Sequence, residues 1–219
     1  MSQNTIDLTQ IVISGAVSLV AAFAGAYFAF KFQSQTMRKD IEGQNILAAL
    51  EALFCLIRMV NHVGAFRKQF IEPTRSERLR HFSMPPMSEH TEEYQLNWSK
   101  LTFLLSSEHA NVLNELSLTY TKFRTLENAI SERSNIMLNV VQPRVEAAGI
   151  MSGEYYSTEE HIENLLGHRT YVSLKRITDD IVLFADESFD DIWESINNLK
   201  LSIQNIYPHA KLPNIGVES

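Results

Sequence analysis

The sequence predicts an all-α protein in which a single N-terminal transmembrane helix continues into a cytoplasmic antiparallel helical bundle. Three observations predict this fold class. An uncharged apolar run lies near the N-terminus, apolar residues recur at spacings of three and four along most of the remaining chain, and no stretch alternates apolar and polar residues as a strand does. The eight glycines and six prolines are few for a domain with many tight turns.

The composition excludes several classes of protein. Hydrophobic residues make up 45% of the 219 residues and charged residues 21%, which is typical of a globular chain and not of a disordered one. The single cysteine, Cys55, cannot form an internal disulfide, so a disulfide-stabilised secreted domain is excluded. The formal net charge of -7 argues against a dedicated nucleic-acid-binding protein, and we expect no nucleic-acid partner.

Residues 11–30 form the apolar run, without a charge, an amide side chain or a proline. At about 1.5 Å per residue a helix of this length spans roughly 30 Å, the thickness of the hydrocarbon core of a bilayer. The alternatives are a cleaved signal peptide and a buried core helix. A signal peptide begins with a basic stretch, whereas residues 1–10 contain Asp7 and no Lys or Arg. We therefore expect a retained transmembrane helix at 11–30.

The charges that flank this run predict its orientation. No basic residue precedes it, while Lys31, Arg38 and Lys39 follow it closely. The positive-inside rule then predicts a short extracytoplasmic N-terminus at residues 1–10 and a cytoplasmic domain at residues 31–219. We expect a single-pass protein of the bacterial inner-membrane type.

The predicted transmembrane helix is rich in small residues. Four of them recur every four positions, at Ser14, Ser18, Ala22 and Ala26. Such a stripe lets two helices approach closely in lipid, where van der Waals contact drives association. We therefore expect a homo-oligomer.

The next predicted helix covers residues 32–71 and continues the anchor. Its apolar stripe follows a spacing of three and four. Leu47, Leu50, Phe54, Ile57 and Asn61 lie along it, and Ile46, Leu53 and Val60 widen it. Pro73 is expected to end this helix, because proline is unfavourable in a helix interior. Residues 73–93 lack periodicity and are expected to form a loop. A second bundle helix is predicted at about residues 91–105.

The third bundle helix is predicted at residues 107–148. Apolar residues recur every seven positions, at Leu116, Phe123, Ile130 and Met137, and Leu113 and Tyr120 fill intervening positions. This repeat is typical of left-handed, coiled-coil-like packing. The pattern weakens at Glu127 and Ser134, and Pro143 is expected to kink or interrupt the helix.

The last helical stretch is predicted at residues 158–206. Ser157 and Glu160 have the spacing of a capping box, and a long apolar stripe follows. Gly167 is the only glycine of the stretch. Since Asp186 or Ser188 can cap a new helix, the sequence leaves open one kinked helix or two.

Clusters of charge lie in two parts of the chain. The acidic cluster comprises Asp179, Asp180, Asp186, Glu187, Asp190, Asp191 and Glu194. Its basic counterpart comprises Arg67, Lys68, Arg75, Arg78 and Arg80, together with His81. Because no glycine-rich phosphate-binding loop accompanies the carboxylates, we expect them to be solvated or to pair with basic residues.

The seven histidines do not have the spacing of metal ligands. His161 and His168 lie seven residues apart on one predicted helix face, where surface or interface positions are the more common interpretation. Cys55 lies in an apolar stretch and is expected to be a small core residue. We predict no metal site and no cofactor.

The stretch from Arg75 to His81, RSERLRH, resembles the R-x(4–6)-H signature of HEPN-type ribonucleases. Members of that family are helical bundles, and some are membrane-associated defence proteins. The resemblance covers seven of the 219 residues and implies that Arg75 and His81 would cleave a phosphodiester. In the family the motif opens a late bundle helix, whereas here it falls in a predicted loop. Neither residue is therefore predicted to be catalytic.

The sequence contains no P-loop, dinucleotide fingerprint, nucleophile elbow or Cys/His nucleophile pair. We therefore predict a non-enzymatic scaffold or interaction module that self-associates and presents its bundle to a protein partner. The alternative is a membrane effector of the defence or toxin type, either an oligomeric pore-former or a HEPN-like ribonuclease.

Overall fold

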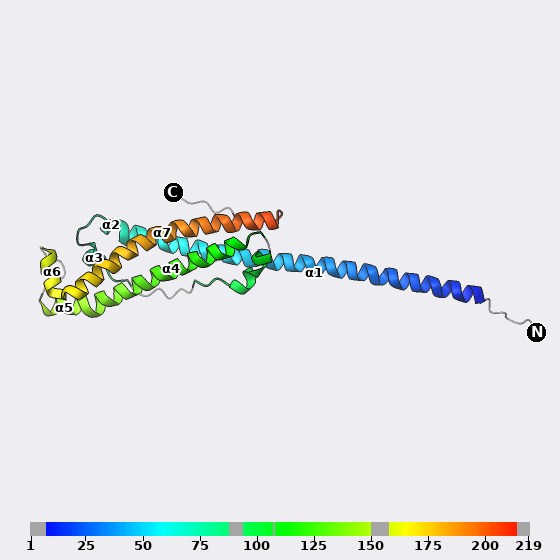
Figure 1. Ribbon diagram of the computed structural model, residues 1–219, viewed down its shortest axis with the longest axis horizontal. Coiled ribbons are helices and arrows are strands. Elements are labelled where there is room, and N and C mark those ends of the chain that lie inside the picture. The colour runs from blue at the N-terminus through cyan, green and yellow to red at the C-terminus, as the bar shows by residue number, and fades with distance from the viewer. Residues whose placement is uncertain (1–7, 88–93, 107, 150–157, 214–219) are drawn as a thin grey trace, which may run out of the picture. The chain divides into compact units, whose positions relative to one another are not determined.

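The computed structural model describes residues 8–87, 94–106, 108–149 and 158–213. Over these residues the chain is helical and contains no strand, which confirms the all-α class (Figure 1). The α-helices are α1 (Leu8–Phe66), α2 (Glu72–Thr74), α3 (Arg80–Ser83), α4 (Ala110–Ile136), α5 (Gln142–Ala147), α6 (Glu159–Leu166) and α7 (His168–Ile206). Two π-helical turns, Arg67–Ile71 and Met137–Val141, and a 3₁₀ helix, Trp98–Ser106, complete the helical elements of the described residues.

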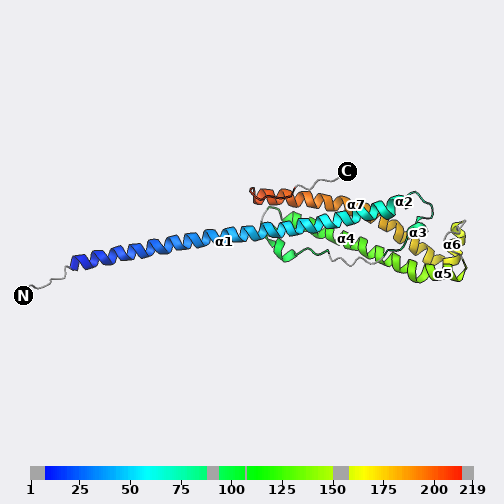
Figure 2. The ribbon, with the colours of Figure 1, turned by 180° about the vertical axis from the view of Figure 1, so that it is seen from behind.

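The chain divides into two compact units, residues 1–47 and residues 48–219. In the first unit, the described residues belong to the N-terminal part of α1. The second unit contains the C-terminal part of α1 and all the later elements, and we call it the bundle. In both ribbon views α4 and α7 lie side by side along much of their length (Figure 2).

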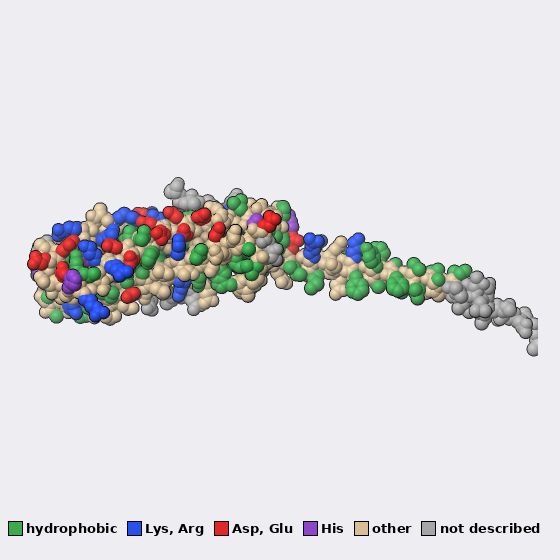
Figure 3. All heavy atoms as spheres, in the orientation of Figure 1, with side chains coloured by type: hydrophobic (Ala, Val, Ile, Leu, Met, Phe, Trp, Pro, Cys, Tyr) green, Lys and Arg blue, Asp and Glu red, His purple; other side chains and the backbone are tan. Residues whose placement is uncertain are grey.

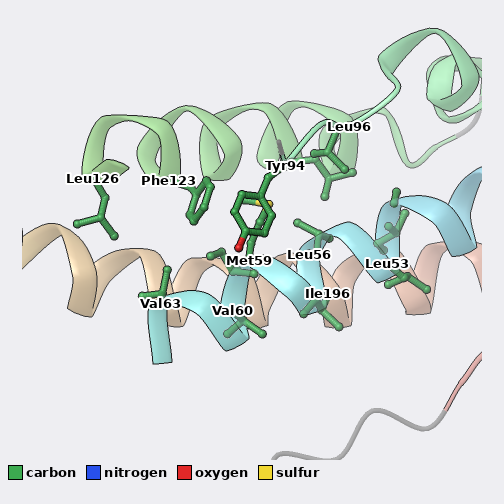
Figure 4. Packing of buried hydrophobic residues seen from close by; sticks show 14 of the residues in the cluster. Leu53, Leu56, Met59, Val60, Val63, Tyr94, Leu96, Phe123, Leu126 and Ile196 are labelled. Atoms are coloured by element: carbon green, nitrogen blue, oxygen red, sulfur yellow. The ribbon is translucent and has the colours of Figure 1, made fainter. Parts of the chain in front are cut away.

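The core of the bundle is formed by apolar side chains of α1, α4 and α7. Leu53, Leu56 and Met59 of α1 are fully buried, and so are Phe123 of α4 and Ile196 of α7. Figure 4 shows several of these side chains around the Phe123 ring. Burial of one such side chain contributes about 1.5–3 kcal/mol. The bundle therefore has a hydrophobic core of its own.

The face of α1 that packs in the bundle matches the predicted stripe only in part. Leu47 and Phe54, which the periodicity places on the stripe, are 56% and 62% exposed. The buried face carries Leu53 and Val60, from the edge of the predicted stripe, together with Ala49, Leu56 and Val63. Both faces are apolar, and alanines make the buried face flatter, so that a neighbouring helix can approach closely. Spacing alone does not choose between two apolar faces of one helix.

Close approach is also seen where α1 meets α7. A Cβ atom added to Gly64 would lie 3.1 Å from the Phe189 ring, closer than an ordinary contact. The absence of a side chain at Gly64 therefore lets the Phe189 ring pack against the backbone of α1.

The seven-residue repeat of α4 packs largely as predicted. Leu116, Phe123 and Met137 are buried, and Ile130 is partly buried. Its companion positions differ, however, because Leu113 and Tyr120 are only half-buried. The second buried row consists of Val112, Thr119, Leu126 and Arg133. Two polar residues in this row bond to α7, so hydrogen bonding decides part of the register here.

Both helix-interior prolines follow a π-helical turn. The turn Arg67–Ile71 precedes Pro73 and the turn Met137–Val141 precedes Pro143, and helical backbone continues past each proline. The expectation that Pro73 ends the helix at residue 71 is thus wrong, since helical backbone continues three residues further, to Thr74. Pro143 marks a transition without ending the helical path. The extra residue of a π turn moves away the carbonyl with which the proline ring would clash.

The C-terminal stretch is broken at Gly167, and α7 continues without interruption past Asp186 and Ser188. Gly167 has a φ of 76°, a conformation that side chains with a Cβ rarely adopt, so the chain turns there at little cost. The cap of α6 is Thr158, whose hydroxyl accepts a hydrogen bond from the His161 N–H. Ser157, the predicted cap, lies outside the described residues.

The helix predicted at residues 91–105 is shorter in the structure than predicted, and it is a 3₁₀ helix and not an α-helix. Residues 91–93 lie outside the described residues, residues 94–97 are not helical, and Trp98–Ser106 forms a 3₁₀ helix that buries Leu101 and Leu104. The predicted loop at 73–93 contains α3. The helix predicted to begin at residue 107 begins at Ala110.

Substituting Phe123 with alanine should lower the free energy of unfolding by about 3–5 kcal/mol, because its ring is fully buried and its removal leaves a cavity. The measurement is urea unfolding of the full chain in detergent, followed by circular dichroism. Leu118→Ala is the matched control, since Leu118 is exposed on the same helix and its truncation should change the free energy by less than about 0.5 kcal/mol. Equal effects of the two substitutions would contradict the proposed core.

Candidate functional site

The N-terminal part of α1 has the clearest functional signal. Among the described residues, one helix is long and apolar enough to cross a membrane, and none of its most apolar 18-residue window is buried in the protein. Large side chains such as Val20, Phe23 and Phe30 are exposed there. Figure 3 shows hydrophobic side chains along this part of α1, and charged side chains over the bundle. An uncovered apolar surface of this kind is typical of a segment that contacts lipid or another protein.

The residues that the sequence singled out in this segment are accessible. Lys31, Arg38 and Lys39 are exposed, as are Ser18 and Ala22 of the small-residue stripe. A Cβ atom added to Gly15 or Gly25 would contact nothing within 4 Å. Exposed small side chains at these positions can contact lipid or a second helix.

The basic and acidic clusters of the bundle pair with one another. Asp186 of α7 lies 2.9 Å from the guanidinium groups of both Arg67 and Arg75. The hydrogen bonds from Arg75, together with the charge of Arg67, lower the pKa of the Asp186 carboxyl. Arg80 donates to Asp179, with the shorter contact at 2.6 Å. The pairing expected from the sequence is therefore present for these residues.

A second, buried arrangement surrounds Arg133 of α4, which is only 2% exposed. Its Nε donates to the Thr178 hydroxyl at 3.0 Å, and its Nη1 donates to the Pro85 carbonyl at 3.1 Å. Its Nη2 donates to the carbonyls of His81, at 3.2 Å, and Met84. Desolvation lowers the pKa of the guanidinium to about 10. Arg133 thus joins α4 to α7 and to the chain between α2 and the 3₁₀ helix.

The two residues of the ribonuclease-like motif lie in different surroundings. The Arg75 guanidinium is on the surface and is held by both carboxylate oxygens of Asp186. His81 is 1% exposed, and its ring packs edge-to-face against Tyr171 at 5.1 Å between centroids. Each residue has a structural role in the described chain, and no contact joins their side chains there.

A hollow of about 620 Å³ lies in the bundle beside α1 and α4. His62 and Glu127 line it and are joined by a contact of 2.9 Å between Nε2 and Oε1. Both side chains are mostly buried, and the His62 ring packs edge-to-face on Phe123. The pair ties α1 to α4 at a position where the seven-residue repeat would otherwise place an apolar residue.

Sequence reasoning missed this pair, although it noticed the interruption of the repeat at Glu127 and Ser134. Both interruptions have a structural cause. Glu127 pairs with His62, which lies 65 residues earlier, and the Ser134 hydroxyl accepts a hydrogen bond from the Met87 N–H at 3.0 Å. Polar residues at apolar positions of a repeat were the available signal. Their partners lie too far away in the sequence for any local spacing to identify them.

The remaining candidate residues have no site geometry. Burial raises the pKa of the Cys55 thiol, which disfavours the reactive thiolate. His168 contacts Glu163, and His161 is exposed. Within the part of the chain that the structure describes, no group of three His, Cys, Asp or Glu side chains is placed to hold a metal ion.

Comparisons with known proteins do not extend this picture. No protein-family model, no curated protein and no solved structure matches the chain.

Replacing Arg133 with methionine should destabilise the bundle by roughly 2–4 kcal/mol, because it leaves three carbonyls and one hydroxyl, most of them buried, without their donor. Urea unfolding of the full chain in detergent measures the effect. Arg124→Met is the control, since Arg124 is exposed on the same helix. The role of Arg133 is refuted when the two variants unfold at the same urea concentration.

Proposed function

We propose that the chain is a single-pass inner-membrane protein whose residues 11–30 cross the bilayer and whose helical bundle is a cytoplasmic scaffold or interaction module. The observation that carries this proposal is the apolar, unburied N-terminal part of α1 in a chain whose bundle has a separate, well-buried core. In water the exposed apolar side chains would be unfavourable, whereas a bilayer solvates them.

The orientation is proposed from charge. Lys31, Arg38 and Lys39 are exposed after the apolar run, and no basic residue precedes it. Basic residues are retained on the cytoplasmic side of inner-membrane proteins. Residues 1–10 would then lie outside and the bundle inside.

The bundle is proposed to be antiparallel. Along α4 the bonded residues Thr119, Lys122 and Arg133 follow one another, while their partners in α7 run in the opposite order, Ser195, Asp191 and Thr178. Such an arrangement keeps the seam closed over the length of both helices.

An interaction role is favoured over catalysis because the polar groups of the bundle are engaged in holding it together. Arg133, Glu127 and Asp186 each bond to residues distant in sequence. A rigid bundle with paired surface charges is suited to presenting a constant surface to a protein partner. Self-association is proposed to occur through the small-residue face of the transmembrane helix.

Fusions to the C-terminus test the topology. A fluorescent protein fused after Ser219 should be fluorescent, and alkaline phosphatase at the same place should be inactive, because the proposed bundle is cytoplasmic. The reverse pattern would overturn the orientation.

Charged substitutions in the apolar run test the membrane anchoring. The double substitution Val20→Asp and Phe23→Asp should release the protein from membranes during carbonate extraction, since each aspartate at the centre of a span costs roughly 2.5–3.5 kcal/mol. Leu118→Asp places the same charge at an exposed apolar position of α4 and should leave the protein in the membrane fraction. Release of both variants, or of neither, would speak against the anchor.

The small-residue face is tested by adding bulk to it. Ala22→Ile keeps the segment apolar but holds two backbones apart, so association of the span should fall in a transmembrane two-hybrid assay. Val20→Ile is the control, because two residues along a helix correspond to about 200° around its axis. Equal association of the two variants would remove this face as the contact and leave the cytoplasmic helices to form any oligomer.

A further inference from the structure

Residues 75–87, which we call the clasp segment, are held against the bundle by polar contacts at both ends. At its start, Arg75 and Arg80 donate to Asp186 and Asp179 of α7. At its end, the Met87 N–H donates to the Ser134 hydroxyl of α4. Between these contacts Met84 is buried in the core. The clasp segment therefore contacts two helices that are far from it in sequence.

The centre of the clasp segment is hydrogen-bonded to a buried cation, the guanidinium of Arg133. Three of its carbonyls, from His81, Met84 and Pro85, accept hydrogen bonds from the Arg133 guanidinium. None of the described contacts of this guanidinium is with a carboxylate. Carbonyl dipoles stabilise the buried charge without neutralising it, so a second positive charge nearby would be strongly unfavourable.

His81 is the titratable group of the clasp segment next to this charge. Its side chain is buried, and its Nε2 has no hydrogen-bond partner among the described residues. The groups that face it are Arg133 from α4, Glu159 from α6, and Tyr171, Lys175 and Asp179 from α7. Of the two carboxylates, Asp179 is already paired with Arg80. Glu159 acts on the imidazole through its charge, but neither carboxylate is hydrogen-bonded to Nε2, so the proton of an imidazolium would have no acceptor there among the described residues.

We propose that protonation of His81 releases the clasp segment from the bundle. When the imidazole is neutral, its ring packs on Tyr171 and the clasp segment stays on α4 and α7. When the imidazole is protonated, the buried Nε2–H lacks an acceptor and the new charge lies close to Arg133, so the clasp segment detaches. Mild acidification thereby exposes the parts of α4 and α7 that the clasp segment covers.

The direction of the pH dependence follows from the surroundings of the imidazole. Burial is the largest cause that lowers the pKa of His81; the charges of Lys175 and Arg133 act in the same direction, and those of Glu159 and Asp179 oppose it without reversing it. The open form, with a solvated imidazole, keeps a pKa near 6.5 and binds the proton more tightly. The clasp is therefore held fully above about pH 6.5 and loses stability as the pH falls towards the lowered pKa of the closed form.

Hydrogen exchange of the full chain in detergent tests the proposal. The reporters are amide groups of the clasp segment: that of Met87, whose hydrogen bond to Ser134 is broken on release, and those of Phe82, Ser83 and Met84, whose bonds to Leu79 and Arg80 lie within the segment and lose their packing against the bundle. After correction for the intrinsic exchange rate, the equilibrium constant for opening at these amides should increase up to about tenfold between pH 7.5 and pH 5.5. The factor is about ten because pH 5.5 lies about one unit below the pKa of the open form, and each such unit favours opening tenfold. Amides in the middle of α4 should not change.

Three variants make the test specific to His81. His81→Phe keeps a planar ring against Tyr171 but cannot be protonated, so the acid-induced opening should disappear. His81→Gln serves the same purpose if the phenylalanine variant does not fold. His168→Gln removes an exposed histidine of α7 and should behave as the natural sequence does.

The proposal is overturned if the clasp segment of the natural sequence opens equally at both pH values. It is also overturned if the His81 variant retains the acid-induced opening, or if the His168 variant loses it.

Discussion

The hydrogen bonds of one buried guanidinium hold together the end of the bundle that is formed by elements distant in sequence. Arg133 lies on α4, but its partners come from α7 and from the chain that follows α2. A charged group is expensive to desolvate, and it is tolerated here because each of its nitrogens has an acceptor. The path of the clasp segment therefore depends on Arg133, since another path would leave the buried guanidinium without its three carbonyl acceptors.

Polar residues act in the same way elsewhere along α4. Thr119 bonds to Ser195, and Glu127 bonds to His62, so each contact joins α4 to one other long helix. An apolar seam permits neighbouring helices to slide by a turn at little cost, whereas a buried hydrogen bond is lost on sliding. These polar contacts thus define one register of the helices, although an apolar residue at each of the positions would bury more hydrophobic surface.

The N-terminal part of α1 follows a different physical rule from the bundle. In the bundle, apolar side chains are removed from water by packing on one another. In the segment that includes Val20 and Phe23, apolar side chains point to all sides and none of the apolar window is buried. A helix satisfies its own backbone hydrogen bonds, so it needs only an apolar solvent around its side chains. That requirement is the physical basis of the proposed membrane anchor.

The sequence by itself determined the helical class, the apolar segment at 11–30 and the repeat of Leu116, Phe123 and Met137, because each of these is a local or periodic property of the chain. It did not determine which side of the wide apolar stripe of α1 is buried, since burial of the Phe54 side and burial of the Leu53 side are both compatible with a helix. Nor did it predict the π-helical turns before Pro73 and Pro143. From the sequence alone each proline indicates a helix end, whereas in the structure the π turn relieves the steric clash of the proline ring. The pairing of Arg67 and Arg75 with Asp186 was expected as one of two outcomes, but the convergence of His81, Arg133 and Tyr171 was not. These three residues lie on different elements, and only tertiary packing brings them together and withdraws them from water.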